Sequence, residues 1–370
     1  MRISQVELRK VSLPLVRPFR TSSSYRQSIT HVLVRVQAES GQVGWGECSA
    51  PVDPYYCAET TGTCWHILKE FLVPSLLEQD WREPGEIAPL FGPIKGNRFA
   101  RAGLEMACID AWCRENGLSV ARWLGGIRAR IESGVSLGIE TDLGRLFAII
   151  DQHLAEGYAR IKLKIAPGHD LNLVRSVRSA YPSLKLQVDA NSAYTLTDTN
   201  TLRQLDDLQL LLIEQPLGDD DLIDHAELQK QLVTPLCLDE SLHSLDDVRK
   251  ALQIQACRVV NIKPGRVGGL VEARRIHDYC QARTIPVWCG GMHEFGIGRA
   301  ANVALASLPG FSLPGDVSGS SKYFEHDLVT PAIEAERGTI FVYYEQPGLG
   351  VEPQLDRIEH HTTAFWSSAS

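Results

Sequence analysis

Residues 160–165 read Arg-Ile-Lys-Leu-Lys-Ile, a short run in which charged and aliphatic side chains alternate, and this run decides the fold. Similar short apolar runs recur through residues 134–316, and stretches with helical patterning separate them. Strands that alternate with helices form a parallel sheet, and eight of them indicate a closed (β/α) barrel. The predicted strands are residues 134–139, 160–165, 186–191, 211–216, 236–241, 259–264, 286–291 and 311–316.

An open, doubly wound sheet is the alternative architecture. Such sheets carry a glycine-rich nucleotide fingerprint after the first strand. The glycine pair Gly296-x-Gly298 follows the seventh predicted strand and is too short to count as that fingerprint. We therefore prefer the barrel.

The residues before the barrel predict a smaller α+β unit. Valines alternate with other side chains over residues 32–37, which is the period of a half-buried strand. A turn at residues 39–42 predicts a hairpin with the next strand. The predicted elements are strands over residues 3–15 (stopping near Pro14), 32–37 and 43–47, and helices over residues 60–77 and 98–115.

We expect three parts in the chain. Residues 1–125 form an α+β capping domain, residues 126–320 form the (β/α) barrel, a modified TIM barrel, and residues 321–370 form a C-terminal segment. The strand–helix rhythm stops after the last predicted barrel strand, and a β-rich stretch follows at residues 339–345. We therefore expect the tail to return to the capping domain.

The overall charge limits the function classes. The net charge is −8, the isoelectric point is near 5.8 and no basic run occurs, which argues against nucleic acid and anionic membranes as partners. We find no signal-peptide pattern and no apolar run of membrane-spanning length, so we expect a cytoplasmic protein. The nine cysteines contain no Cys-x-x-Cys pair and should be reduced and mostly buried. We also expect a homo-oligomer.

Ionisable side chains recur near the ends of the predicted barrel strands. Asp189, Glu214 and Asp239 follow one another at intervals of 25 residues. Lys164 lies 25 residues before the first acid, and Lys263 lies 24 residues after the last. This interval corresponds to one strand–helix repeat and places the side chains at one height on adjacent strands. They should meet at the C-terminal mouth, where barrel enzymes have their active sites.

Three carboxylates at one mouth predict a metal site. They repel one another unless a cation joins them. Oxygen ligands from three rigid strands suit a hard divalent ion, so we expect Mg²⁺, with Mn²⁺ as a substitute. Acids that merely cap neighbouring helices are the alternative, but three in register between two lysines favour the metal.

The lysines predict proton transfer. Lys162 and Lys164 are two residues apart on a strand and point to one face, so each should disfavour protonation of the other and free Lys164 to act as a base. Lys263 lies across the barrel, and Arg266 should lower its pKa in the same way. A carboxylate substrate held between two amines suits removal of an α-proton.

These residues together resemble the enolase superfamily, in its muconate-lactonizing-enzyme subgroup, which uses Lys or His bases with Mg²⁺. The turn Gly290-Gly291-Met292 adds to the likeness. Within the subgroup the chain resembles the branch that contains o-succinylbenzoate synthases and N-succinylamino acid racemases. The segments that carry this likeness are Val188–Asn191, Ile213–Pro216, Cys237–Ser241, Asn261–Gly269 and Leu313–Asp316.

The resemblance implies roles for particular residues. Asp189, Glu214 and Asp239 would be the metal ligands. Lys164 would be the base and later the acid, and Lys263 would stabilise the enolate as a cation or act as the second base of a racemase. The substrate would be a small carboxylate with a succinyl group, whose tail reaches loops at residues 19–26 and 51–56. Its further contacts would be Lys162, Ser136, Asn191 and Met292, and backbone N–H groups around Ser318, Gly319 and Ser320 would bind the far carboxylate of the tail.

Several alternatives stay open. The synthase and the racemase need the same metal and lysines, so these residues do not separate them. Dipeptide epimerases carry Asp-x-Asp at the eighth strand, whereas this chain has Asp316-Val317-Ser318. Muconate cycloisomerases and a non-catalytic binding barrel are further alternatives. His293 departs from the expected pattern, and we expect it to line the pocket or pack.

Overall fold

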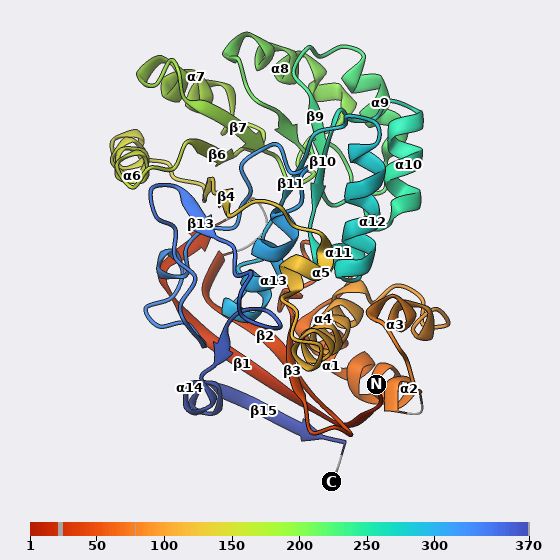
Figure 1. Cartoon of the computed structure of the whole chain (residues 1–370). Coiled ribbons are helices and arrows are strands. Elements are labelled where there is room, and N and C mark those ends of the chain that lie inside the picture. Colours follow the sequence, from red (N-terminus) through yellow and green to blue (C-terminus); the bar gives the residue numbers. More distant parts are fainter. Residues whose placement is uncertain (21–24, 78, 369–370) are drawn as a thin grey trace.

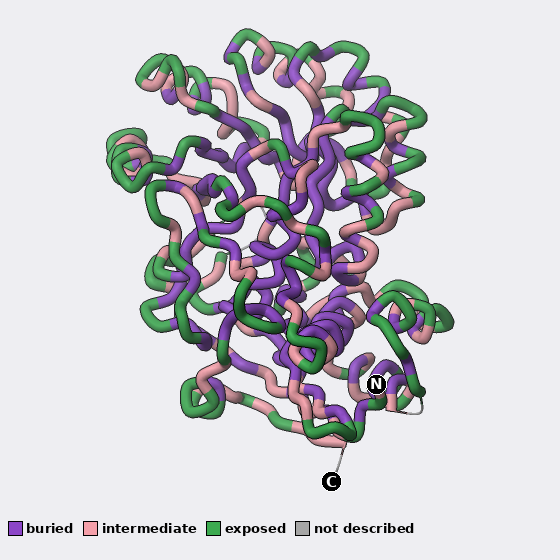
Figure 2. The backbone as a smooth tube through the Cα atoms, in the orientation of Figure 1, coloured by how far each residue is buried: buried purple, intermediate pink, exposed green. Residues whose placement is uncertain are grey.

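The protein consists of an antiparallel sheet with helices and a barrel of parallel strands. The computed structural model describes residues 1–20, 25–77 and 79–368. Figure 1 shows the barrel at one end and the antiparallel sheet at the other, with both termini beside that sheet. Buried backbone concentrates in the barrel strands and in helix α4 (Arg98–Glu115), whereas exposed positions lie on the outer barrel helices, in the loops and around the N-terminal sheet (Figure 2).

The antiparallel sheet has the strand order β15-β1-β2-β3. β1 does not end near Pro14, as we predicted, but continues to Arg20. Pro14 pairs with Ser28, and the register then shifts before Phe19 pairs with Arg26. Proline is tolerated in a strand at such an irregularity, where its missing N–H breaks no regular ladder. The strands are β1 (Ile3–Arg20), β2 (Tyr25–Ala38), β3 (Val43–Cys48) and β15 (Thr362–Ser367).

Strand β2 is half-buried over residues 34–37, as expected, because Arg35 and Gln37 stay partly exposed, but around Leu33 it is buried on both faces. Val32, Val34 and Val36 pack in the core of the N-terminal domain. Ile29 and Leu33 face the other way and join the core that continues into the barrel. The second face of β2 is therefore covered only around Ile29 and Leu33, where it joins the core that continues into the barrel.

The predicted N-terminal helices are present. Helix α4 lies directly against β3, because an added Cβ at Gly46 would lie 2.0 Å from the Gly103 carbonyl oxygen. The expected helix at residues 60–77 contains a π-helical turn, Leu68–Leu72. The helices are α1 (Thr61–Ile67), α2 (Val73–Leu77), α3 (Ile87–Leu90), α4 (Arg98–Glu115) and α5 (Val120–Leu124), with a 3-10 turn at Pro84–Glu86.

The barrel sheet contains seven parallel strands in sequential order. Each lies within one of the first seven predicted strands or begins one residue before it. They are β5 (Val135–Leu137), β6 (Arg160–Lys164), β7 (Lys185–Asp189), β8 (Ile213–Glu214), β9 (Leu236–Leu238), β10 (Val259–Ile262) and β11 (Val287–Cys289).

Helices follow these strands and cover the outside of the barrel (Figure 1). The helices are α6 (Leu143–Ala155), α7 (Leu171–Ala180), α8 (Thr199–Gln204), α9 (Leu222–Gln229), α10 (Leu245–Gln253), α11 (Pro264–Val267), α12 (Leu270–Gln281) and α13 (Gly296–Ala306). Short 3-10 turns occur at Leu196–Asp198, Asp206–Leu208 and Ser320–Lys322.

The eighth predicted strand is irregular, and this prediction is corrected. Residues 311–316 make single parallel bridges, Val287 to Phe311 and Ser133 to Gly315. Pro314 has no N–H to donate, so a continuous ladder cannot form. Individual hydrogen bonds still link this segment to both ends of the sheet: Asp316 donates to the Cys289 carbonyl, and Gly134 donates to the Gly315 carbonyl.

The tail contacts both parts of the molecule. β15 pairs with β1, whereas β13 (Thr339–Phe341) pairs with β4 (Arg130–Glu132). The remaining elements are β12 (Val329–Thr330), β14 (Glu352–Pro353) and α14 (Leu355–His360). The domain limits at residues 125 and 320 stay predictions. All nine cysteines are free thiols, and eight are buried. None of the helices in the described residues could cross a membrane.

Candidate active site

A cavity of about 180 Å³ lies at the C-terminal ends of the barrel strands. The barrel lines it with ionisable and polar side chains, and the N-terminal domain adds aromatic side chains and an arginine. Residues 21–24 of the expected substrate loop at 19–26 lie outside the described residues. The lining includes Ser136, Lys162, Lys164, Asp189, Asn191, Glu240, Lys263, Met292, His293 and Asp316 from the barrel, and Phe19, Arg26, Tyr55 and Tyr56 from the N-terminal domain.

The strand register explains why the predicted residues meet. Lys164 on β6 lies beside Asp189 on β7, and Asp189 lies beside Glu214 on β8. Asp239 directly follows β9, and Lys263 directly follows β10. Adjacent parallel strands end at one edge of the sheet, so the 25-residue spacing brings these five residues to one place. All five are at most 9% exposed.

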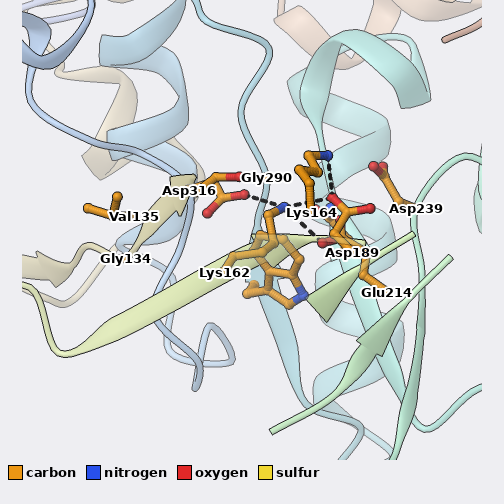
Figure 3. Close-up of polar contacts among 12 residues, drawn as sticks. Gly134, Val135, Lys162, Lys164, Asp189, Glu214, Asp239, Gly290 and Asp316 are labelled. Carbon is orange, nitrogen blue, oxygen red and sulfur yellow. Dashed lines mark hydrogen bonds and ion pairs between the residues drawn. The ribbon is translucent and has the colours of Figure 1, made fainter. Parts of the chain in front are cut away.

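Lys162 lies among three carboxylates, as Figure 3 shows. Its Nζ is 2.8 Å from Glu214 Oε2, 3.1 Å from Asp189 Oδ2 and 2.5 Å from Asp316 Oδ2. Burial alone lowers its pKa, but the charges of Asp316, Glu214 and Asp189 outweigh burial, and the pKa is raised. The expectation that the two lysines disfavour each other's protonation is therefore wrong for Lys162.

Lys164 points into the cavity beside Lys162. Its Nζ donates to Asp189 Oδ2 at 2.6 Å and to the side-chain oxygen of Asn191. The amide nitrogen of Asn191 donates to Glu240 Oε1 at 2.8 Å. Asn191 thus orients both the lysine and a buried acid, and its positive φ of 44° is tolerated by asparagine.

Lys263 shares a carboxylate with Arg266. Its Nζ is 2.7 Å from Asp239 Oδ2 and 3.1 Å from the Tyr56 hydroxyl, and the Arg266 guanidinium contacts Asp239 Oδ1. Burial lowers the pKa of Lys263, but Tyr56, Glu240 and Glu214 outweigh burial and raise it. Arg266 therefore does not depress the pKa of Lys263 as we expected, because its charge is directed to Asp239.

Two matches to family models cover most of the chain. Residues 147–357 match the enolase C-terminal domain-like family, and residues 3–125 match the N-terminal domain of mandelate racemase and muconate lactonizing enzyme. The chain belongs to the enolase superfamily. A solved member of the enolase superfamily from Listeria innocua has a TM-score of 0.96 and 41% identity, and the match covers 99% of each chain.

Two kinds of enzyme occur among the relatives that are more than 40% identical to this chain. An o-succinylbenzoate synthase of Geobacillus kaustophilus is 48% identical over 97% of this chain and 96% of its own length. An N-succinylamino acid racemase of an Amycolatopsis species is 46% identical over 98% of each chain. Both kinds of enzyme therefore match the chain almost end to end.

Enolase superfamily members are metal-dependent, typically with Mg²⁺, and the donor types here fit such an ion. Three carboxylates on adjacent strands are oxygen ligands for a hard cation. Burial and then the charge of Asp189 raise the pKa of Glu214 more than the nearby Lys162 lowers it, so the negative charge of this carboxylate is only partly compensated. Within the described residues, however, no three His, Cys, Asp or Glu side chains are grouped closely enough to hold a metal, because the acids turn toward the lysines and Arg266.

The predicted substrate contacts divide into two groups. Ser136, Asn191 and Met292 line the cavity, but Ser318, Gly319 and Ser320 are not among its lining residues. The Ser320 N–H donates to the Ile333 carbonyl, and the Ser318 hydroxyl donates to the Gly134 carbonyl. These bonds occupy the Ser320 N–H and the Ser318 hydroxyl, and the contact expected between residues 318–320 and the substrate stays a prediction.

His293 lines the cavity between two aromatic rings. Its ring centre is 4.6 Å from that of Phe19 and 5.0 Å from that of Tyr323. Burial, followed by the nearby charge of Arg26, holds its pKa well below the usual value. A neutral ring between aromatic side chains agrees with the expected lining or packing role.

Two residues that contact the predicted site residues lie outside the 25-residue spacing. Arg160 is fully buried, and its guanidinium is 2.7 Å from Asp316 Oδ1. It precedes Lys162 by two residues, so the same alternation along β6 could have identified it. Tyr56 comes from the N-terminal domain, and its hydroxyl donates to Asp239 Oδ1 at 3.1 Å. No short sequence pattern predicts this contact between distant segments.

Proposed function

We propose that this protein is an o-succinylbenzoate synthase, which dehydrates 2-succinyl-6-hydroxy-2,4-cyclohexadiene-1-carboxylate. The observation that carries the proposal is the pair Lys164 and Lys263, which enter one cavity from different strands and each contact a carboxylate. The near full-length relatives of that name support the same reaction.

Lys164 performs the proton transfers in this proposal. Its amine takes the proton from the carbon next to the substrate carboxylate, and the electrons of that C–H bond move into the carboxylate to form an enediolate. These electrons return to form a C=C bond as the adjacent C–O bond breaks. Lys164 then gives its proton to the departing hydroxide, so water leaves from the same face and the ring becomes aromatic.

The other cationic side chains hold negative charge. Lys263 faces the enediolate as a cation, and Lys162 helps to neutralise the substrate carboxylate. Ser136 and Asn191 line the cavity and orient the substrate through their polar groups. A preorganised cation in a buried site stabilises developing charge without solvent reorganisation.

We further propose that Asp189, Glu214 and Asp239 hold Mg²⁺, with Mn²⁺ as a substitute. When bound, the ion would stabilise negative charge on the substrate carboxylate. It would also compete with the lysines for the three carboxylates and so weaken these ion pairs. A cytoplasmic location and a homo-oligomeric state are also part of the proposal.

N-succinylamino acid racemase activity is the second candidate. Three strands separate β6 from β10 in the sheet order, so Lys164 and Lys263 approach the cavity from different sides. One lysine removes the α-proton of an amino acid derivative, and the other delivers a proton to the opposite face. The relatives named as racemases favour this second activity.

Turnover of both substrates by one purified sample tests the proposal. Dehydration is followed by absorbance, and racemisation by polarimetry, each with Mg²⁺. Incubation in deuterated buffer adds a readout of α-proton exchange by NMR. Rapid dehydration with slow racemisation supports the synthase, and the reverse supports the racemase. Absence of dehydration, racemisation and exchange would refute both assignments.

A further inference from the structure

We propose that Arg26 is the specificity residue that binds the second, distal carboxylate of the substrate. This inference rests on the proposed function, because it concerns the succinyl end of the same molecule. It predicts that the site selects acyl groups that end in an anion over neutral acyl groups of similar size.

The cations that line the cavity differ in how many of their hydrogen-bond donors are already used. Lys162, Lys164 and Lys263 each contact carboxylates of the barrel. Arg299 also lines the cavity, but its two terminal nitrogens donate to the carbonyls of Ser318 and Glu294. Both arginines have a buried Nε without an acceptor among the described residues, but Arg299 uses both terminal nitrogens whereas the pair with Asp53 uses one of Arg26, so Arg26 keeps more donor capacity for a ligand.

Arg26 has unused hydrogen-bonding capacity. One terminal nitrogen lies 3.2 Å from Asp53 Oδ1, and the side chains of Arg26 and Asp53 are 14% and 24% exposed. Its Nε is buried and meets no acceptor among the described residues. A guanidinium carries five donors in a planar fork, and a carboxylate can accept two of them at once. A buried N–H without an acceptor is costly, so an incoming carboxylate recovers that cost.

Arg26 reaches the cavity from the N-terminal hairpin, whereas the lysines reach it from the barrel strands. Arg26 is directly opposite Phe19 across β1 and β2, which places both side chains on one face of the ribbon. Phe19 packs against His293, whose low pKa also reflects the nearby charge of Arg26. A substrate held at the lysines can therefore run past these rings and end at the guanidinium.

Asp53 occupies only part of the Arg26 guanidinium and leaves room for a second carboxylate. The pair with Arg26 uses one terminal nitrogen, and Asp53 is more exposed than its partner. A second carboxylate at Nε would share the guanidinium with Asp53, whereas a neutral acyl group would leave Nε without a charged acceptor. The selectivity is therefore the difference in binding free energy between the anionic and the neutral ligand.

Binding of a matched ligand pair tests the proposal. We would measure by calorimetry the affinity of an N-succinylamino acid and of its ω-methyl ester, with Mg²⁺ present, for the wild type, Arg26→Gln and Arg26→Lys. Arg26→Gln should weaken binding of the acid by roughly 10- to 100-fold, the range expected for a charged hydrogen bond. The ester should change by less than about threefold, and Arg26→Lys should recover part of the acid's affinity because it restores the charge.

The matched control is Arg17→Gln, at an exposed arginine of β1 that does not line the cavity. It should leave both affinities unchanged. In turnover assays Arg26→Gln should raise KM for the succinylated substrate much more than it lowers kcat. Equal loss of acid and ester binding would overturn the role of Arg26, as would failure of the wild type to prefer the acid. A wild type that binds the acid preferentially but catalyses nothing would instead refute the proposed function alone.

Discussion

At the scale of single residues, the site is built from buried charges that compensate one another. Lys162 meets Glu214 and Asp316, Lys164 meets Asp189, and Lys263 meets Asp239. A buried charge is tolerated only when it is paired, so each of these lysines depends on acids from neighbouring strands. Substitutions that retain the charge therefore separate a catalytic role from a structural role.

The two lysines should respond differently to substitution. Lys164→Ala should abolish both dehydration and racemisation, because one group acts as base and acid. Lys263→Arg keeps the positive charge but cannot readily transfer a proton, so it should stop racemisation and leave part of the dehydration. Loss of a general acid–base group costs roughly 10²–10⁴-fold in rate, which steady-state kinetics can resolve.

Isotope exchange checks the same assignment directly. In deuterated buffer Lys263→Arg should still exchange the α-proton of one enantiomer of an N-succinylamino acid and not the other. Exchange of both enantiomers at wild-type rates would show that Lys263 is not the second base.

The sequence predicts these residues because their order along the chain repeats with the strands. It does not predict their partners equally well. The ion pair between Arg160 and Asp316 joins the second strand to the irregular segment beside the first, and such closure contacts have no local pattern. The effect of Arg266 is also missed, because the sequence does not reveal that its guanidinium contacts Asp239.

At the scale of elements, Glu105 connects the two domains. It lies on α4, and its Oε2 accepts the N–H of Leu270 at 2.5 Å, at the start of barrel helix α12. Burial raises the pKa of Glu105 to about 8. The acid therefore caps a helix of the other domain at the cost of its own desolvation.

This raised pKa predicts a pH dependence of stability. In the unfolded chain Glu105 releases its proton near its ordinary pKa of 4.5, whereas in the folded protein it does so near 8. Between these values the folded state binds more protons, so its stability should fall as the pH rises from about 5 to 8. Glu105→Gln keeps the acceptor without the titration and should flatten this dependence in urea unfolding.

A matched control for this change lies on the same helix. Glu115 is exposed at the end of α4, so Glu115→Gln should keep the wild-type slope. If Glu105→Gln retains the wild-type slope as well, another group is responsible for the pH dependence.

The first seven barrel strands and both long N-terminal helices follow from periodicity, because each buries its own apolar side chains. The strand predicted at residues 311–316 does not form a continuous ladder, because Pro314 lacks the backbone N–H that the ladder needs. β1 exceeds its predicted end because pairing with β2 resumes after Pro14, and only the partner strand reveals this.

At the scale of the whole molecule, the cavity belongs to both domains. The barrel contributes the lysines and acids, and the hairpin of β1 and β2 contributes Phe19 and Arg26. β1 is also paired with β15 from the far end of the chain, so three distant segments position the cavity. Sequence periodicity predicts the barrel part of this site far better than the part that depends on domain contact.

The contrast between core and site leads to a prediction about metal removal. The main core consists of apolar side chains that run from the N-terminal sheet through the barrel, and the proposed ligands already have lysine or arginine partners. Chelation should therefore abolish turnover while the fold persists. A bound ion present at about 100 times its dissociation constant adds roughly 2.7 kcal/mol of stability. In a protein of this size that should shift Tm by roughly 5 °C or less.

Circular dichroism and calorimetry on the same chelated sample measure this directly, with activity restored by adding Mg²⁺ as the control for irreversible damage. The acids can keep their internal partners without the ion, so the far-ultraviolet spectrum should not change. Full turnover in metal-free protein would exclude the metal-assisted reaction. Loss of the cooperative unfolding transition on chelation would instead show that the ion holds the barrel together, because the lysine contacts alone would then be too weak to hold the strand ends.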